Sequence, residues 1–159
     1  MNIKLVEVKA EKKELLWNML QKYLYEMTNF YYDIMDEDGN YPYRFFDEYF
    51  SDSRRKAYFI HNDEALVGFV LLNPYSSIGK NPDFTIAEFT IFPAYRRKHI
   101  AIEAAKAILD KHPGIWEIKY NDKNEKAKRL WNTVAAPYGP KVVSIEDYET
   151  VLTFSTEIG

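Results

Sequence analysis

The spacing of apolar residues changes several times along the chain, and each change marks a predicted element. Ile3 and Leu5 alternate with polar neighbours, which predicts a first strand. Over residues 11–28 the apolar residues recur every three or four positions, which predicts an amphipathic helix. A turn around Gly39 follows, and the aromatic-rich residues 43–50 predict a shorter second helix.

The rest of the chain alternates strands with helices. Residues 57–61 and 65–72 flank an Asn-Asp turn and predict a hairpin. Residues 83–91 predict a strand, and the alanine-rich helix that follows ends at residues 112–114. The remaining predicted elements are a strand over residues 115–120, a helix over 124–134 and two β-rich stretches over 141–145 and 149–155. Because neither a repeat nor a linker interrupts this order, we expect one α/β domain spanning residues 1–159.

Composition and charge narrow the classes of function. The chain has 159 residues, of which 47% are hydrophobic, enough for one substantial core. Its formal net charge of -3 provides no general attraction to nucleic acid or to an anionic membrane. The sequence has no cysteine and its three histidines are far apart, so we expect neither a disulfide nor a metal site. Since it has no apolar signal segment or membrane-spanning stretch, we expect a cytoplasmic protein.

Positive charge is concentrated where the alanine-rich helix begins. Arg96, Arg97, Lys98 and His99 occupy its predicted first turn, where the helix dipole disfavours each cation by about 0.3–1 kcal/mol. The same turn has backbone N–H groups without partners inside the helix, which makes it a candidate anion site. A bound polyphosphate would neutralise the charges. The alternative is a solvated basic patch that balances acidic neighbours.

Three short motifs, in the order of the predicted elements, carry a resemblance to a known family. After a strand and Pro-x-Tyr, residues 96–101 read Arg-Arg-Lys-His-Ile-Ala. On the next predicted helix lie Asn124, Ala127, Leu130 and Trp131. Upstream, residues 67–69 read Val-Gly-Phe within a strand. These residues resemble the GNAT superfamily of N-acetyltransferases, whose acetyl-CoA signature is Arg or Gln, two residues, Gly, one residue, then Gly or Ala.

The resemblance implies a GNAT-like mixed, mostly antiparallel central sheet of six or seven strands flanked by about four helices. It also implies that an acetyl group passes from acetyl-CoA to a primary amine by direct attack, without a covalent enzyme intermediate. Backbone N–H groups near Thr90 to Phe92 would polarise the thioester carbonyl, where this family's strands splay apart. The residues expected to bind the cofactor are Phe89, Thr90, Ile91, Phe92, Arg96, Arg97, Lys98, His99, Ile100, Ala101, Asn124, Ala127 and Trp131.

Two positions depart from the family pattern. His99 stands where the family has glycine, and its Cβ atom would crowd a loop that brings backbone amides against a diphosphate. Trp131 stands where many relatives carry a tyrosine that protonates the departing thiolate, and an indole cannot supply that proton. Tyr138, Tyr120 or water is then the acid. These departures leave two alternatives open: a noncatalytic acyl-CoA-binding module and a protein-docking domain without CoA.

A general base is needed, because an alkyl ammonium with a pKa of about 10.4 must lose a proton before it attacks a thioester. Glu88 is the first candidate, because it lies in an otherwise apolar strand where burial would raise its pKa. It could instead be an edge-facing or ion-paired carboxylate. Glu117 is the second candidate, since some relatives place a base on that strand.

Residues 27–50 are crowded with aromatic and acidic side chains and resemble the family's variable acceptor-binding segment. Tyr31, Tyr32 and Asp33 are the expected contacts for a small cationic amine, through charge and cation–π attraction. The aromatic residues could equally cover the core or form a contact in a homodimer.

Overall fold

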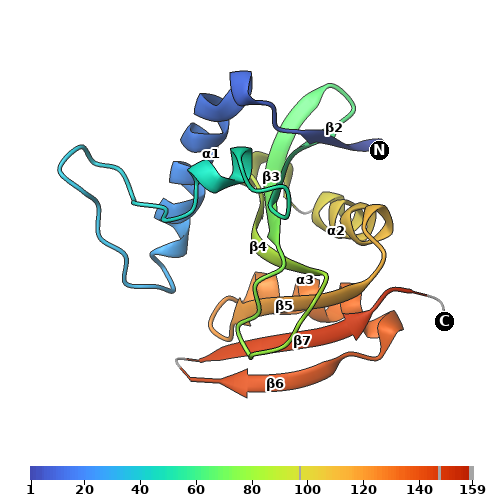
Figure 1. Ribbon diagram of the computed structural model, residues 1–159. Coiled ribbons are helices and arrows are strands. Elements are labelled where there is room, and N and C mark those ends of the chain that lie inside the picture. The colour runs from blue at the N-terminus through green and yellow to red at the C-terminus, as the bar shows by residue number, and fades with distance from the viewer. Residues whose placement is uncertain (97, 147, 158–159) are drawn as a thin grey trace.

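The computed structural model describes residues 1–96, 98–146 and 148–157 (Figure 1). Its strands are β1 (Ile3–Glu7), β2 (Lys56–Asn62), β3 (Ala65–Asn73), β4 (Phe84–Ile91), β5 (Ile115–Asn121), β6 (Lys141–Ile145) and β7 (Glu149–Ser155). Its α-helices are α1 (Lys13–Met27), α2 (Ile100–Lys111) and α3 (Glu125–Ala135). Short 3-10 helices cover Ala10–Lys12, Asp47–Phe50, Pro93–Tyr95 and Ala136–Tyr138.

In the described residues, seven strands form one sheet in the order β1-β2-β3-β4-β5-β7-β6 (Figure 1). Neighbouring strands are antiparallel, except that β4 and β5 are parallel. The expectation of a mixed, mostly antiparallel sheet is confirmed. The alternating and apolar stretches of the sequence therefore identified the strands correctly.

The described ranges contain three α-helices, one fewer than the four or so expected. The predicted helix over residues 43–50 is wrong, because this stretch forms turns and the 3-10 helix Asp47–Phe50. Five of its eight residues are aromatic, and aromatic side chains lose rotamer freedom in an α-helix. Phe46 and Tyr49 are buried, and the ring of Phe46 lies edge-on against Trp17 of α1, with centroids 4.9 Å apart. Separate aromatic anchors thus fix this segment.

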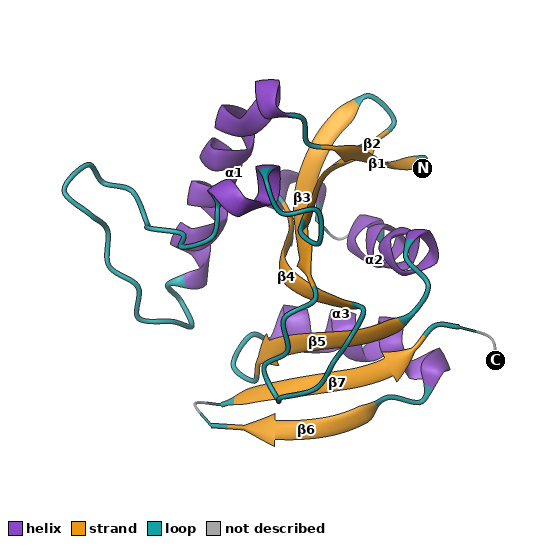
Figure 2. Cartoon of the chain, viewed as in Figure 1, coloured by secondary structure: helices purple, strands orange, loops and turns teal. Residues whose placement is uncertain are grey.

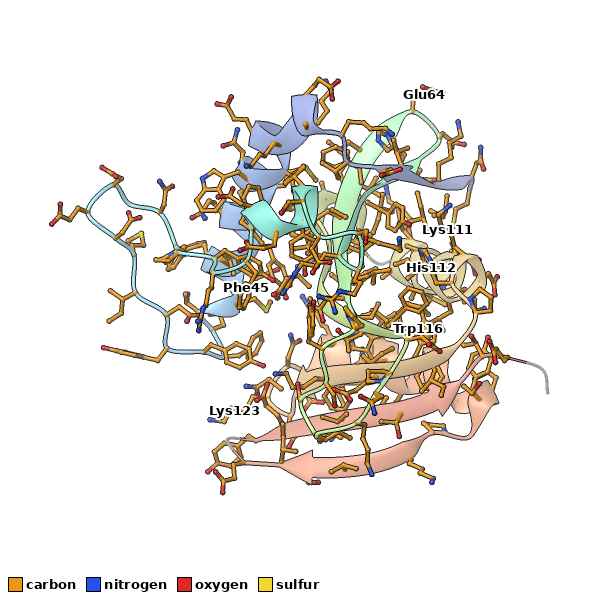
Figure 3. The ribbon with its side chains drawn as sticks, viewed as in Figure 1. Phe45, Glu64, Lys111, His112, Trp116 and Lys123 are labelled. Atoms are coloured by element: carbon orange, nitrogen blue, oxygen red, sulfur yellow. The ribbon has the colours of Figure 1, made fainter. Side chains whose placement is uncertain are left out.

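Helices cover both faces of the sheet. Val70 and Leu72 of β3 pack with α2 and α3, whereas Phe69 and Leu71 pack with α1 on the opposite face, as strand alternation requires. At the turn after α2, the indole Nε1 of Trp116 donates to the backbone carbonyl oxygen of His112 over 2.9 Å; Figure 3 labels both residues. No helix in the described part of the chain combines the length and apolar composition needed to cross a membrane.

The sheet opens between β4 and β5. In the described chain their parallel pairing is confined to residues 84–86 of β4, whereas β4 stays paired with β3 as far as Ile91. An irregularity in the β3–β4 register falls at the same place, between Leu71 and Leu72. Figure 2 shows β4 and β5 running in clearly different directions. One edge of β4 is therefore open beyond residue 86.

Gly68 of β3 allows β4 to approach closely beside this opening. A Cβ atom at Gly68 would overlap the carbonyl oxygen of Thr90 and lie 3.1 Å from the Cα atom of Ile91. Because both contacts are with backbone atoms, rotation of a neighbouring side chain could not relieve them. The Val-Gly-Phe motif thus sets the position of the strand that borders the opening.

Candidate active site

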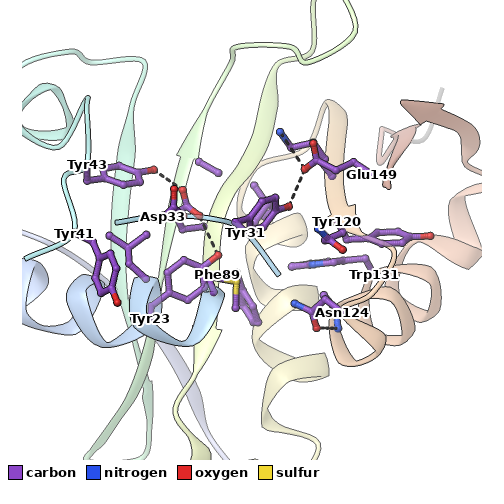
Figure 4. Close-up of a pocket in the computed structure, with 18 of the residues that line it drawn as sticks. Tyr23, Tyr31, Asp33, Tyr41, Tyr43, Phe89, Tyr120, Asn124, Trp131 and Glu149 are labelled. Atoms are coloured by element: carbon purple, nitrogen blue, oxygen red, sulfur yellow. Dashed lines mark hydrogen bonds and ion pairs between the residues drawn. The ribbon is translucent and has the colours of Figure 1, made fainter. Parts of the chain in front are cut away.

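A cavity of about 590 Å³ lies where β4 and β5 diverge. Figure 4 shows side chains from α1, β4, β5, α3, β7 and the loop after α1 gathered around it. Its polar lining includes Tyr23, Tyr31, Asp33, Tyr43, Glu88, Lys119, Asn121, Asn124 and Glu149, and its apolar lining includes Phe89, Ala127 and Trp131. The cavity thus brings together residues expected to bind the cofactor, the acceptor and the transferred proton.

Glu88 of β4 is held in this cavity by two hydroxyl groups. Tyr23 donates to its Oε1 over 3.0 Å, and Tyr43 donates to its Oε2 over 2.6 Å. Burial raises the pKa of the Glu88 carboxyl above its ordinary value of 4.5. The bonds from the two tyrosines and the charge of Lys119 act against that rise, while Asp33 adds to it. Glu88 is therefore a desolvated carboxylate with two donors.

Backbone donors on β4 alternate between the β3 side and the open side. The N–H of Phe92 donates to the carbonyl oxygen of Val67 over 2.8 Å, so Phe92 is bonded to β3. Residues of an antiparallel strand alternate in this respect, so Thr90, which is two residues before Phe92 and opposite Phe69, has the same orientation. The N–H groups of Phe89 and Ile91 consequently point away from β3, toward the opening. The N–H groups of Phe89 and Ile91 are therefore not hydrogen-bonded to β3, whereas the N–H of Phe92 is.

Arg96, the first residue of the signature motif, is occupied by contacts within the protein. Its Nη1 and Nη2 atoms each donate to the Glu26 carboxylate over 2.8 Å, and its Nε donates to the carbonyl oxygen of Ile91 over 2.6 Å. The backbone N–H of Arg96 donates to the carbonyl oxygen of Pro93 over 3.3 Å. The side chain therefore joins β4 to α1, and Arg97 lies outside the described residues.

The basic residues expected in the first turn of the alanine-rich helix precede it instead, because α2 begins at Ile100, with His99 as its N-cap and Arg96 at the end of the 3-10 helix before it. Lys98 and His99 are exposed, Ile100 is buried and Ala101 is partly buried. The N–H of Glu103 makes the first bond of α2, to the carbonyl oxygen of residue 99, so the preceding amides lack intrahelical acceptors. His99 itself has φ 60° and ψ 10°, the left-handed conformation that glycine adopts most easily. The backbone at residue 99 thus has a conformation that favours glycine, although this chain has histidine there.

The α3 residues of the second motif form one wall of the cavity. Asn124 caps the helix, because its side chain accepts from the N–H of Ala127 over 3.1 Å. Trp131 is buried, and its ring lies edge-on against Phe89, with centroids 5.1 Å apart. The second motif therefore contributes directly to the cavity, whereas the described residues of the motif over 96–101 are not part of its lining.

The two tyrosines considered as the acid lie in different places. Tyr120 lines the cavity and its hydroxyl oxygen accepts from Asn132 over 2.9 Å, which leaves its own hydroxyl hydrogen available. Tyr138 stacks on Phe154, with ring centroids 5.5 Å apart, and is not part of the cavity lining. Of the two, Tyr120 alone is placed beside the opening.

Glu117 is placed away from the cavity. Its carboxylate accepts from the hydroxyl of Ser76 over 2.6 Å and from the backbone N–H of Ser77 over 2.7 Å. The side chain is almost fully buried, with 2% of its surface exposed. Glu117 thus anchors the loop between β3 and β4, and Glu88 is the candidate base that faces the cavity.

The expected acceptor contacts are divided. Tyr31 and Asp33 line the cavity, whereas Tyr32 is 94% exposed and does not. The hydroxyl of Tyr31 donates to Glu149 over 2.8 Å, and the Nζ of Lys119 lies 3.6 Å from the same carboxylate.

Within the described ranges, no group of three histidine, aspartate or glutamate side chains is arranged to hold a metal ion.

The polar residues of the cavity lining that were not predicted from the sequence include Tyr23, Tyr43, Lys119, Asn121 and Glu149. Tyr23 is part of the apolar face of α1, so its spacing indicated a core residue. Lys119 and Glu149 come from strands β5 and β7, which pair with each other. The alternation of the predicted strand places Lys119 on the face of Glu117, a signal that could have found it.

The family and its structural relatives are identified by comparison. The profile of the Acetyltransferase (GNAT) family matches residues 21–134. A search of curated proteins found no match. An acetyltransferase from Thermus thermophilus is similar with a TM-score of 0.64 and 16% identity, covering 98% of this chain and 97% of that chain. A GNAT family acetyltransferase from Streptococcus agalactiae is similar with a TM-score of 0.71 and 13% identity, covering 98% and 96%.

A third similar structure contains ligands. It is the aminoglycoside acetyltransferase AAC(6')-Ib in complex with ribostamycin and coenzyme A, with a TM-score of 0.70 and 9% identity, covering 99% of this chain and 94% of that chain. At these identities the structural likenesses show the fold. The profile match covers well over half of the sequence, and the chain therefore belongs to the acetyltransferase (GNAT) family.

Proposed function

We propose that this chain is an acetyl-CoA-dependent N-acetyltransferase whose acceptor is a small cationic primary amine. The observation that carries the proposal is the place of Glu88, whose carboxylate faces the cavity beside the opening between β4 and β5. A base there is within reach of an amine in the cavity. The opening provides unpaired backbone donors for a thioester carbonyl.

The residues present are suited to acetyl-CoA. The amides of Phe89 and Ile91 point into the opening and would polarise the carbonyl of the thioester. The amides at the start of α2, with Lys98 and His99 beside them, would receive the diphosphate. When bound, acetyl-CoA supplies the acetyl thioester. The chain's own contribution is to hold that group and to exclude other orientations.

Glu88 would accept the proton of the acceptor ammonium, directly or through water. Its raised pKa brings the carboxyl closer to the pH at which an effective base exchanges protons. Charge supports a cationic acceptor, because Lys119 is paired with Glu149, which leaves the carboxylates of Asp33 and Glu88 in excess within the described lining. The acceptor is then attracted as a cation and loses its proton beside Glu88.

One observation favours a second candidate function. Trp131 lines the cavity at the position where the family pattern carries the acid, and its indole cannot protonate a thiolate. If neither Tyr120 nor water supplies that proton, the chain is a noncatalytic acyl-CoA-binding module. The two functions share the cofactor and differ in turnover.

A screen of amines separates these functions. Polyamines, aminoglycosides, amino sugars and a lysine peptide are each incubated with the protein and acetyl-CoA, and thiol release is recorded. We expect release with at least one cationic amine, and a rise of Tm with acetyl-CoA, because a ligand of the folded state stabilises it by mass action. A rise of Tm without thiol release for any amine would identify the noncatalytic module. An unchanged Tm would contradict cofactor binding.

A further inference from the structure

Two tyrosines from different elements hold the carboxylate of Glu88. Tyr23 of α1 bonds one oxygen and Tyr43 of the loop after α1 bonds the other, as the dashed lines in Figure 4 show. They are 65 and 45 residues from Glu88 in the sequence. Because both oxygens are fixed, the carboxylate has a defined orientation relative to the cavity.

Both tyrosines remain donors throughout the physiological pH range. Burial raises the pKa of each hydroxyl well above its ordinary value of 10.0, and the nearby charge of Glu88 raises it further. A carboxylate that accepts one bond on each oxygen still has lone pairs for another proton. The two bonds stabilise the ionised form of Glu88, which is the form that acts as a base.

The other groups that face Glu88 act in both directions. Lys119 of β5 favours the ionised carboxylate, whereas Asp33 of the loop after α1 and burial itself disfavour it. The charge of Glu88 also raises the pKa of Tyr49, whose hydroxyl oxygen accepts from the side-chain amide of Asn73 over 3.3 Å. Tyr23 and Tyr43 are therefore the hydrogen-bond donors that offset the burial of Glu88.

The position of Tyr43 depends on how the loop after α1 is docked. The side chain of Gln21 donates to the carbonyl oxygen of Tyr41 over 2.8 Å and accepts from its N–H over 2.6 Å. Phe46 packs against Trp17 of the same helix. Tyr43 lies between these two anchors, so its bond to Glu88 forms when the end of the loop rests on α1.

We propose that Tyr23 and Tyr43 are positioning residues that hold Glu88 ionised and oriented, and that Tyr43 couples this base to the docking of residues 28–46 on α1. The inference rests on the proposed function, because it takes Glu88 to be the base. The segment expected to bind the acceptor then also supplies a hydrogen bond that holds Glu88 ionised, so the acceptor site and the base form together.

The first test compares the pH dependence of kcat/KM in Tyr43→Phe, Tyr23→Phe and the double variant. Loss of one donor disfavours the ionised carboxylate about tenfold. The acid limb, which is the fall of kcat/KM at low pH as the base is protonated, is therefore expected to move up by about one pH unit in each single variant and about two in the double variant. Activity relative to wild type should then recover as pH rises above the limb. An equal loss at every pH, or an unmoved limb, would overturn the proposal.

Tyr58→Phe is the matched control for loss of a buried hydroxyl. Tyr58 is 6% exposed and its hydroxyl bonds His112 over 2.8 Å, away from the cavity. We expect its acid limb to coincide with that of the wild type. A limb that moves as far in Tyr58→Phe as in Tyr43→Phe would show that the shift has a general structural cause, against the proposal.

A second measurement needs no acceptor. The side-chain carboxyl carbon of Glu88 is titrated by NMR, with its signal assigned by comparison with Glu88→Gln. We expect its midpoint to rise by about one pH unit in Tyr43→Phe, and no rise would overturn the role of Tyr43. Full activity in Glu88→Gln would instead refute the base in the proposed function, while the titration would still report whether the tyrosines hold the carboxylate ionised.

Gln21→Ala tests the coupling to the loop. This variant keeps both tyrosine hydroxyls but removes the two bonds that anchor Tyr41. We expect a smaller upward shift of the Glu88 midpoint in Gln21→Ala, and no additional shift when it is combined with Tyr43→Phe, because both changes act through one bond. Shifts that add fully would contradict coupling through Tyr43.

Discussion

The guanidinium of Arg96 and the carboxylate of Glu26 form two hydrogen bonds, each 2.8 Å long. Glu26 lies in the last turn of α1, 70 residues before Arg96. Since Arg96 also bonds the carbonyl oxygen of Ile91, one side chain joins the end of β4 to α1. Arg96 thus links two of the elements that line the cavity, α1 and β4.

Arg96→Met is expected to lower the free energy of unfolding by about 1–2 kcal/mol, because charge-assisted bonds to a partly exposed carboxylate are lost. Glu26→Gln should have a similar effect. The double variant should lose less than the sum of the single losses, because both changes remove the same interaction. Denaturant unfolding of the four proteins measures this, and strictly additive losses would contradict a direct pair.

The same pair predicts how stability depends on pH. The hydrogen bonds from Arg96 lower the pKa of the Glu26 carboxyl below its ordinary value of 4.5, whereas burial acts to raise that pKa. A depressed pKa in the folded state stabilises the protein above pH 4.5, and this contribution is lost as pH falls through the folded pKa. The stability difference between wild type and Arg96→Met should therefore narrow in acid, and a difference that widens would exclude this explanation.

His99 adopts a left-handed conformation directly before α2, which costs a residue with a Cβ atom about 1–2 kcal/mol. We expect His99→Gly to raise the free energy of unfolding by about 0.5–1 kcal/mol, after allowance for the greater flexibility of unfolded glycine. His99→Val should lower it, because a β-branched residue tolerates this conformation poorly. The pair of variants is compared by denaturant unfolding, and changes of the same sign in both would count against the strained position.

Glu117→Gln separates the two candidate bases. Because its carboxylate binds Ser76 and Ser77, the change should lower the free energy of unfolding by about 1–3 kcal/mol. The midpoint of the acid limb in kcat/KM should stay where it is in the wild type. If Glu117→Gln abolished activity while its stability was unchanged, the assignment of the base to Glu88 would be wrong.

The strands were predictable because each carries a clear apolar pattern between turn residues. The helix predicted over residues 43–50 failed because Phe46 and Tyr49 are placed by tertiary packing rather than by helical periodicity. An acid inside an apolar strand drew attention to Glu88 as a candidate base, and the structure places it at the cavity. The two β-rich stretches near the C-terminal end likewise indicated β6 and β7, which pair with each other.

The partners of the candidate site residues could not be predicted, because they are distant in the sequence. Tyr23 has the spacing of a core residue, and nothing local indicates that its hydroxyl meets Glu88. Arg96 has the character of a phosphate ligand, yet the fold places it against Glu26. Local patterns specify elements and residue types, whereas these contacts depend on how α1 lies across the sheet.

The most direct test of the account is the pH dependence of acetyl-CoA-dependent thiol release in Glu88→Gln. We expect kcat/KM to fall about 100- to 10,000-fold, the range for loss of a general base, together with loss of the acid limb that the raised pKa of Glu88 produces in the wild type. Acetyl-CoA should still raise the Tm of this variant, which shows that the cofactor site is intact. A folded, cofactor-binding Glu88→Gln protein with wild-type activity and an unchanged acid limb would contradict the account.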